Sequence, residues 1–474
     1  MSFDCNTTYT GKLKYRDIDF TFVFAGTELR LIPPADKESE IEWQWKMKSI
    51  GNGAYTFADP MPVDERYLTS HCNETNQRIV FLPAQGSTLS FNNTVVIIEI
   101  ESFIVCKSND DKFNRVTFSC PEMNYIHPIN KAFTIKIPNE FAKEGVAYFN
   151  TQNFDLTTTD KQKFIVDGKE VQMYFGISRT ISFKIDNPPL TLESVMFFEF
   201  DATNDYSFIL RLWQIARDFI RFLCYRNNIF ITKIELSTSE DDGKYKKFAK
   251  MYINNMDEES EELPLQKGRY IKQIHIADKE GEILSDIASD SIYLRHLPET
   301  FESGHHINAA RFVMITAAFE WEFRRLYPDG IKKSEATINA ENAVCEEIQK
   351  EIDNSSGKKK NIYKFLQHLV KSDSIQPKII QIGKDFSGIV DIFGKHLYQI
   401  NGQELNYSDM GQRLSKQRNN FAHGNLDKDF IGLSLLDLMF LEIVVFAMQL
   451  KHYEIDDIEI QKSINELFQQ RLAI

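Results

Sequence analysis

An arginine, an asparagine and a histidine stand close together near the end of the chain, at Arg418, Asn419 and His423. Arginine is a permanent cation whose planar guanidinium fits a phosphate, and histidine gives or takes a proton near neutral pH. A proton shuttle beside a charge that stabilises a crowded phosphate is enough for an RNA 2′-hydroxyl to attack its own phosphodiester. The chemistry that this pattern predicts is therefore RNA cleavage without a metal ion.

The residues around the motif predict a helix that ends at it. Ser408 and Asp409 are typical of a helix start, and Gly424 is typical of a helix end. On an ideal helix, positions 418 and 423 point roughly 140° apart. The side chains of Arg418 and His423 can converge only if the helix unwinds before the histidine, or if a second subunit completes the site.

Three further residues are candidates for the same site. Arg413 and Lys416 precede the motif on the predicted helix and would add positive charge for RNA. Glu320, on an earlier helix, could orient His423 or a substrate hydroxyl, and the alternative is an exposed Glu320 paired with Arg324 one turn later. For the motif itself the alternative is structural, with an arginine that binds a helix end and a histidine in an exposed loop.

The segment around the motif resembles the HEPN superfamily of nucleases, whose signature is an arginine, a polar residue, a short spacer and a histidine. Arg418, Asn419 and His423 match this signature, with four residues between the arginine and the histidine. The order of a β-rich region followed by a helical region is similar to that of the Apea-like HEPN proteins of bacterial abortive infection. The resemblance implies an α-helical RNase domain that forms homodimers with the motifs facing each other.

The resemblance also implies a role, that of a cytoplasmic toxin of anti-phage defence that arrests growth by endoribonuclease activity. Arg418, His423 and Asn419 would be catalytic, with no cofactor and no metal. RNA would be the substrate, with transfer RNA as a target that fits a narrow slot, and a phage-derived component would be the trigger. Neither DNA nor a membrane would be a partner. The rival interpretation is a non-catalytic dimeric sensor or binding protein whose helical domain only dimerises.

Composition is typical of a protein with several globular domains. The chain has 474 residues, 42% of them hydrophobic, which is enough for two or three domains. A formal charge of −13 argues against broad, non-specific nucleic-acid binding, although a local basic pocket is compatible with it. Six scattered cysteines and a start without a basic or apolar leader favour reduced thiols in the cytoplasm.

Changes in the hydrophobic period divide the chain into three regions, so that the expected fold class is α+β multidomain. Residues 1–204 read as short strands with turns and predict a β-rich, sandwich-like sensor or regulatory domain. Residues 205–300 predict a small α/β block that starts with a helix at 205–225 and includes a strand at 270–276. Residues 301–474 predict an all-α domain of the HEPN type.

The C-terminal region is expected to hold helices at residues 307–326, 335–352, 362–370, 377–398, 408–422 and 430–450. The last of these is the most apolar, and it is nearly long enough to span a membrane. Asp437 and Glu442 inside it predict a buried core or dimer helix instead. An acidic loop at 257–262 could hold RNA away from a basic slot, with a merely solvated loop as the alternative.

Overall fold

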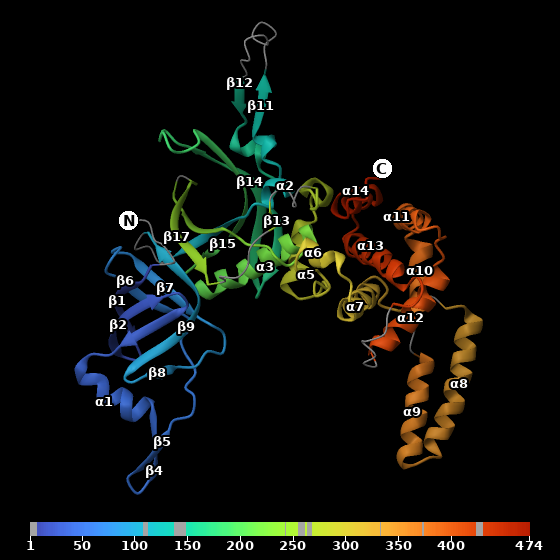
Figure 1. The fold of residues 1–474 in the computed structure, drawn as a ribbon, viewed down its shortest axis with the longest axis horizontal. Coiled ribbons are helices and arrows are strands. Elements are labelled where there is room, and N and C mark those ends of the chain that lie inside the picture. Colours follow the sequence, from blue (N-terminus) through green and yellow to red (C-terminus); the bar gives the residue numbers. More distant parts are fainter. Residues whose placement is uncertain are drawn as a thin grey trace. The chain divides into compact units, whose positions relative to one another are not determined.

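The computed structural model describes residues 7–107, 112–136, 148–241, 243–254, 261–262, 268–331, 333–371, 374–422 and 430–474 (Figure 1). The chain forms two compact units. Unit 1 comprises Met1–Leu223, Asn228–Pro264 and Glu280–Ser289, and unit 2 comprises Cys224–Asn227, Leu265–Lys279 and Asp290–Ile474. The fold is thus mixed α+β, and the segment at 205–300 is divided between the two units.

A six-stranded barrel forms the first part of unit 1, drawn in blue in Figure 1. The strands pair antiparallel in the closed order β1–β2–β3–β9–β7–β6, and β6 returns to β1. Every second residue points inward and fills the barrel with phenylalanines such as Phe22, Phe24 and Phe81. Closure leaves this part without the two stacked sheets of the expected sandwich. The bounds are β1 Tyr9–Tyr15, β2 Ile18–Ala25, β3 Glu28–Ile32, β6 Leu68–Cys72, β7 Arg78–Pro83 and β9 Val95–Cys106.

The long strand β9 also joins a second antiparallel sheet, in the order β9–β17–β16–β10–β15–β14–β13. Helix α3 packs on this sheet, since the ring of Phe208 lies 5.3 Å from that of Phe200 and Phe219 lies 6.4 Å from Phe175. Helix α5 contacts β13. The bounds are β10 Phe113–Ser119, β13 Gln162–Val166, β14 Lys169–Ile181, β15 Leu190–Thr203, α3 Tyr206–Cys224, β16 Lys233–Ser239, β17 Tyr245–Ile253 and α5 Glu280–Ala288.

Shorter elements complete unit 1. They include two small hairpins, β4 with β5 and β11 with β12. Their bounds, with those of the remaining short elements, are α1 Glu38–Glu40, β4 Met47–Gly51, β5 Ala54–Phe57, β8 Ser90–Asn92, α2 Met123–Ile126, β11 Phe133–Lys136 and β12 Tyr148–Thr151.

Unit 2 is a helical assembly around α13 (yellow to red in Figure 1). Helix α13 contacts α7, α11, α12 and α14, and its residues 440–450 are all buried. The prediction of a core helix is therefore confirmed for residues 440–450, whereas Leu435 and Met439 near the start of α13 are 40 and 42% exposed. The bounds are η5 Gln273–Ile276, α6 Phe301–His305, α7 Ala309–Leu326, α8 Glu335–Asp353, α9 Gly357–Lys371, α10 Ile375–Asp385, α11 Ser387–Ile400, α12 Tyr407–Ala422, α13 Ser434–His452 and α14 Asp457–Leu467.

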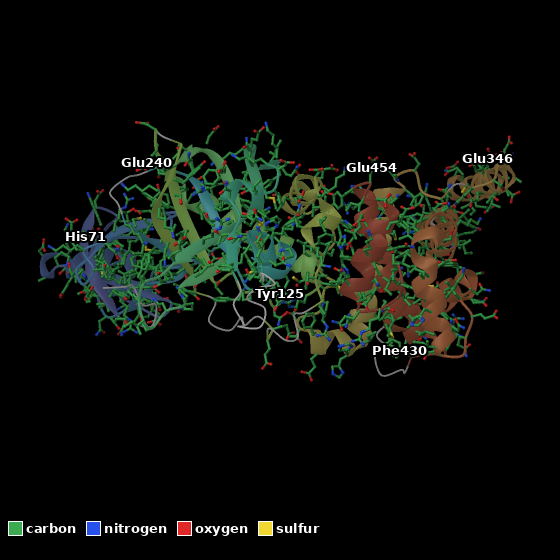
Figure 2. All side chains as sticks on the ribbon, turned by 90° about the horizontal axis from the view of Figure 1, so that it is seen from above. His71, Tyr125, Glu240, Glu346, Phe430 and Glu454 are labelled. Atoms are coloured by element: carbon green, nitrogen blue, oxygen red, sulfur yellow. The ribbon has the colours of Figure 1, made fainter. Side chains whose placement is uncertain are left out.

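Two sequence-based predictions for unit 2 are wrong. The helix expected at 377–398 is two helices, because the backbone of Phe386 leaves the helical conformation between α10 and α11. The strand expected at 270–276 is instead the single 3₁₀ turn η5, whose His275 reaches Glu459 on α14. Figure 2 shows the side chains that fill both units, with Phe430 labelled ahead of α13 and Glu454 just after it. None of the described helices is both long and apolar enough to span a bilayer.

Candidate functional site

Arg418 lies in the last turn of α12 and contacts Glu320 on α7. Its two terminal nitrogens donate to the two carboxylate oxygens of Glu320, each at 3.0 Å. This two-point geometry is the strongest form of an arginine–carboxylate pair. The Nζ of Lys378 on α10 lies 3.9 Å from the same carboxylate. Two cations therefore share one anion, and the Arg418 side chain keeps 34% of its surface exposed.

Packing of α12 fixes where Arg418 points. Met410, Leu414, Gln417 and Phe421 are buried at helical spacing and form the inner face of the helix. The Phe421 ring packs edge-on against Phe312 of α7 at 5.4 Å. Since Arg418 precedes Phe421 by one turn, this anchor holds its side chain beside α7.

The start of α12 differs from the prediction by one or two residues. The side-chain oxygen of Asn406 accepts hydrogen bonds from the backbone N–H groups of Ser408 and Asp409, at 2.9 and 3.2 Å. Asn406 is therefore the capping residue rather than Ser408. The described part of the helix runs to Ala422, and His423 lies outside the described residues.

Gln417 ties the end of α12 to the start of α13. Its buried side-chain oxygen accepts a hydrogen bond from the backbone N–H of Ile431 at 3.0 Å and lies 3.4 Å from the Ser434 hydroxyl. The Phe421 and Phe430 rings are 5.5 Å apart. Phe430 and Ile431, the first described residues after Ala422, therefore lie beside the last described turn of α12. Sequence reasoning overlooked Gln417, whose only signal is a polar side chain in the apolar stripe.

Asn419 and Lys416 are exposed on α12, whereas Arg413 is held by the chain's own carboxylate. The Arg413 guanidinium donates twice to the fully buried Asp437 at 2.7 Å. The Tyr398 hydroxyl donates to the same carboxylate at 2.5 Å. Hydrogen bonding to Asp437 raises the pKa of Arg413, and burial raises the pKa of Tyr398. Arg413 and Lys416 both line a cavity of about 250 Å³.

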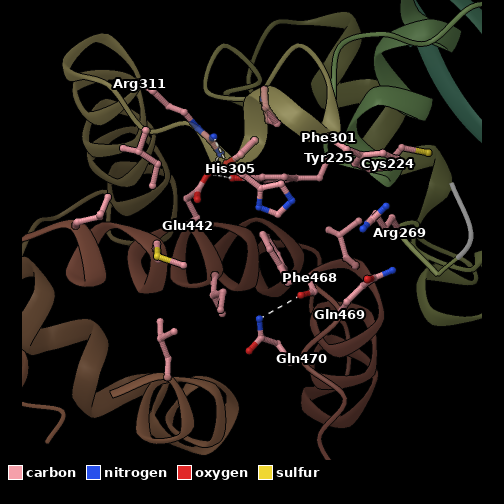
Figure 3. Close-up of a pocket in the computed structure, with 18 residues that line it drawn as sticks. Cys224, Tyr225, Arg269, Phe301, His305, Arg311, Glu442, Phe468, Gln469 and Gln470 are labelled. Atoms are coloured by element: carbon pink, nitrogen blue, oxygen red, sulfur yellow. Dashed lines mark hydrogen bonds and ion pairs between the residues drawn. The ribbon is translucent and has the colours of Figure 1, made fainter. Parts of the chain in front are cut away.

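A second cavity, of about 380 Å³, lies within unit 2 beside a buried ion pair (Figure 3). Arg311 of α7 donates to Glu442 of α13 at 2.5 Å and to the carbonyl oxygens of Ser303 and Gly304. The Tyr225 hydroxyl donates to Glu442 at 3.1 Å. Burial raises the pKa of Glu442 in spite of Arg311, and it raises that of Tyr225. The remaining walls are largely apolar, with Met439, Ile443 and Phe468 among them.

Comparisons with protein families, with curated proteins and with solved structures identified no match for the chain. Within the described ranges, no three His, Cys, Asp or Glu side chains gather as metal ligands. Of the residues predicted as a site, the structure brings Arg418 and Glu320 together and places Asn419 next to them on the exposed side of α12.

Proposed function

We propose that unit 2 is a metal-independent endoribonuclease of the HEPN type that acts in the cytoplasm in anti-phage defence by abortive infection. The observation that supports this proposal is the position of Arg418. Glu320 orients its guanidinium near the end of the described part of α12, and His423 follows Ala422 directly in the sequence. The RNA class, with transfer RNA as one example, and a phage-derived trigger follow from the family resemblance alone.

Arg418 keeps capacity for a phosphate although it is paired. A guanidinium carries five N–H donors, and Glu320 takes two of them within the described part of the chain. Lys378 offsets the charge of the carboxylate. A phosphodiester can therefore approach the other donors of Arg418 while Glu320 holds the edge between the two terminal nitrogens, which is how a positioned charge stabilises a phosphorane.

The reaction needs one bond to form and one to break. His423 takes the proton of the 2′-hydroxyl as the 2′-oxygen attacks phosphorus. Arg418 stabilises the negative charge of the phosphorane, and Asn419 helps to hold the substrate. The bond to the 5′-oxygen then breaks, and this oxygen receives the proton that His423 took up. The products are a 2′,3′-cyclic phosphate and a 5′-hydroxyl.

The test is cleavage of RNA by the purified full-length protein, with and without EDTA. His423→Ala and Arg418→Ala should each lower the rate by at least ~10²-fold, the scale for a lost acid–base group or charge stabiliser. Arg324→Ala is the matched control, because Arg324 is an exposed arginine on α7 one turn after Glu320. Full activity in either motif variant would overturn the proposal.

The rival function is a non-catalytic dimeric sensor or binding protein. The Arg418–Glu320 pair is compatible with it, because a paired arginine also serves as a structural link between α7 and α12. Under this function, wild-type protein leaves RNA intact at every protein concentration, and Arg418→Ala lowers only the free energy of unfolding. The same pair of measurements, RNA cleavage and unfolding, therefore separates the two functions.

A further inference from the structure

Helices α8 and α9 form an antiparallel hairpin in which each helix makes its extensive contacts with the other (Figure 1). The Gln367 side chain on α9 donates to the Cys345 carbonyl at 3.3 Å and to the Gln349 side chain at 3.1 Å on α8. These bonds define the register of the two helices, in which Gln367 lies opposite Cys345 and Gln349. Cys345 and Ile352 are the buried residues of α8.

One side of α9 presents large apolar residues to solvent. Ile362, Phe365, Leu366 and Leu369 are 59, 60, 41 and 49% exposed. Their spacing of three, four and seven residues places them in one stripe of a helix. A stripe of this kind normally faces a core, and a contiguous exposed one indicates an interaction surface.

Helix α8 also has an exposed apolar stripe, but the side chains in it are small. Ala336, Ala340, Ala343 and Val344 are exposed at helical spacing. At 100° per residue, each stripe lies about 125° from the side that faces the other helix. Because the helices are antiparallel, the two stripes come to the same face of the hairpin. This face therefore has a large-residue half on α9 and a small-residue half on α8.

The two halves also carry opposite charge. Helix α8 has six acidic residues and one lysine, and Glu346, labelled in Figure 2, is one of the six. Helix α9 has five lysines and no acidic residue. By the same helical geometry, Glu347 and Glu351 flank the small stripe, and Lys358 and Lys359 flank the large one.

We propose that this face of the α8–α9 hairpin binds the same face of a second copy of the chain. In a dimer with a two-fold axis parallel to the helices, α9 of each copy packs against α8 of the other copy. The same contact therefore occurs twice in the interface. Phe365 and Leu366 then meet Val344 of the partner subunit, and Lys359 meets Glu351 of the partner subunit. Large residues cover small ones and positive charge faces negative charge, so the surface is complementary to itself. This inference does not depend on the proposed nuclease activity.

Other occupants fit the face less well. An anionic membrane attracts a basic amphipathic helix, but the acidic α8 lies on the same face and would be repelled. RNA would be repelled by α8 for the same reason. Only a partner that is acidic where α9 lies and basic where α8 lies matches both halves, and a second hairpin has this pattern.

The first test is the mass of the full-length protein by light scattering at micromolar concentration. The wild type should have twice the monomer mass, and Phe365→Glu with Leu366→Glu should have the monomer mass. Ile338→Glu is the matched control, because Ile338 is 44% exposed on α8 and lies on the opposite side from the proposed interface. Circular dichroism verifies that each variant keeps its helices. A monomeric wild type, or a dimer that the double substitution leaves intact, would overturn the proposal.

A charge exchange tests the orientation. Lys358→Glu with Lys359→Glu should weaken dimers, because it places glutamates against the acidic α8 of the partner. Glu347→Lys with Glu351→Lys should also weaken dimers, because it places lysines against the basic α9 of the partner. Mixed in equal amounts, the two variants should form a heterodimer, because mixing restores opposite charges between chains but not within a chain. A mixture that stays monomeric contradicts the arrangement. So does a monomeric wild type that sediments with phosphatidylserine vesicles and loses this binding with Phe365→Glu.

Discussion

Arg418 and Glu320 are 98 residues apart in the sequence and meet through two parallel hydrogen bonds of 3.0 Å. The pair joins the last turn of α12 to the middle of α7. It sets the plane of the guanidinium, and it leaves 34% of the Arg418 side chain exposed. Glu320 is thus a positioning residue in the proposed reaction, acting through Arg418 rather than on the substrate.

Glu320→Gln should separate positioning from binding. The amide keeps the shape of the carboxylate but loses the ionic pair, so the guanidinium becomes less well oriented. We expect kcat to fall about tenfold, within the range for a misplaced catalytic group. The KM should not rise, since the phosphate no longer shares Arg418 with a negative charge. Steady-state kinetics on RNA measure both constants, and a rise in KM with unchanged kcat would assign Glu320 to substrate binding instead.

Asp437→Ala should destabilise unit 2 strongly. Asp437 accepts two hydrogen bonds from Arg413 and one from Tyr398, and its loss leaves all three donors without their buried acceptor. We expect the free energy of unfolding to fall by about 3 kcal/mol, the lower end for breaking a buried ion pair, because Arg413 retains some exposure. Tyr398→Phe removes one bond and should lower it by about 1 kcal/mol. Urea unfolding measures both values, and equal losses would contradict this account.

The free energy of unfolding should depend on pH through His275. Burial lowers the pKa of His275, but the hydrogen bonds that its ring donates to Glu466 and Glu459 outweigh burial, so the folded-state pKa lies above the ordinary value. The protonated form is favoured in the folded state, so its stabilisation is complete below pH ~6.5 and is lost as pH rises through the folded-state pKa. His275→Gln should therefore be most destabilising near pH 6 and progressively less so toward pH 8. A constant difference between the two proteins across this range would rule out His275 as the source.

Residues 301–474 alone should not form a stable unit 2. They lack Tyr225, whose ring packs against Phe468 at 4.9 Å and Phe446 at 5.6 Å and whose hydroxyl donates to Glu442. Loss of a buried aromatic ring costs about 3–5 kcal/mol. Thermal unfolding of this fragment should be less cooperative than that of the full chain. A fragment that unfolds as sharply as the full chain would show that Tyr225 is dispensable.

This prediction changes how an inhibitory role of the first 300 residues can be tested. The acidic loop at 257–262 is one means by which that region could hold RNA away from the basic slot, and residues 257–260 of the loop lie outside the described residues. Comparing the toxicity of residues 301–474 with that of the intact protein would confuse loss of folding with loss of inhibition. Substitutions confined to unit 1 of the full-length protein avoid this difficulty.

Local sequence signals predicted the helices of unit 2 well. The helix expected at 408–422 is Tyr407–Ala422, because a regular apolar stripe and a polar start are both local properties. The boundary at Phe386 was missed because the apolar stripe of α10 continues in phase into α11. η5 was missed because Ile271 and Ile276 are apolar in either conformation, and its ion pairs with α14 are not visible locally.

Pairs of strands and side chains that are far apart in the chain could not be predicted from the sequence. The closure of the barrel depends on β6 meeting β1 and on β7 meeting β9, and strand patterns alone do not say which strands pair. Glu320 had two possible partners, Arg324 one turn later and Arg418 on a distant helix. The structure pairs it with Arg418, while Arg324 lies over the Trp321 ring. Helical spacing allows the first pair, and only tertiary packing selects the second.

The three-piece composition of unit 2 has a consequence for biosynthesis. Tyr225 enters the core early in the chain, whereas Phe468, which packs against it, follows 243 residues later. While the ribosome is translating, unit 2 cannot be complete until Phe468 has been added to the chain and has left the exit tunnel. A message cut short before the codon of Phe468 would thus yield a protein with a finished barrel and an unfinished helical unit.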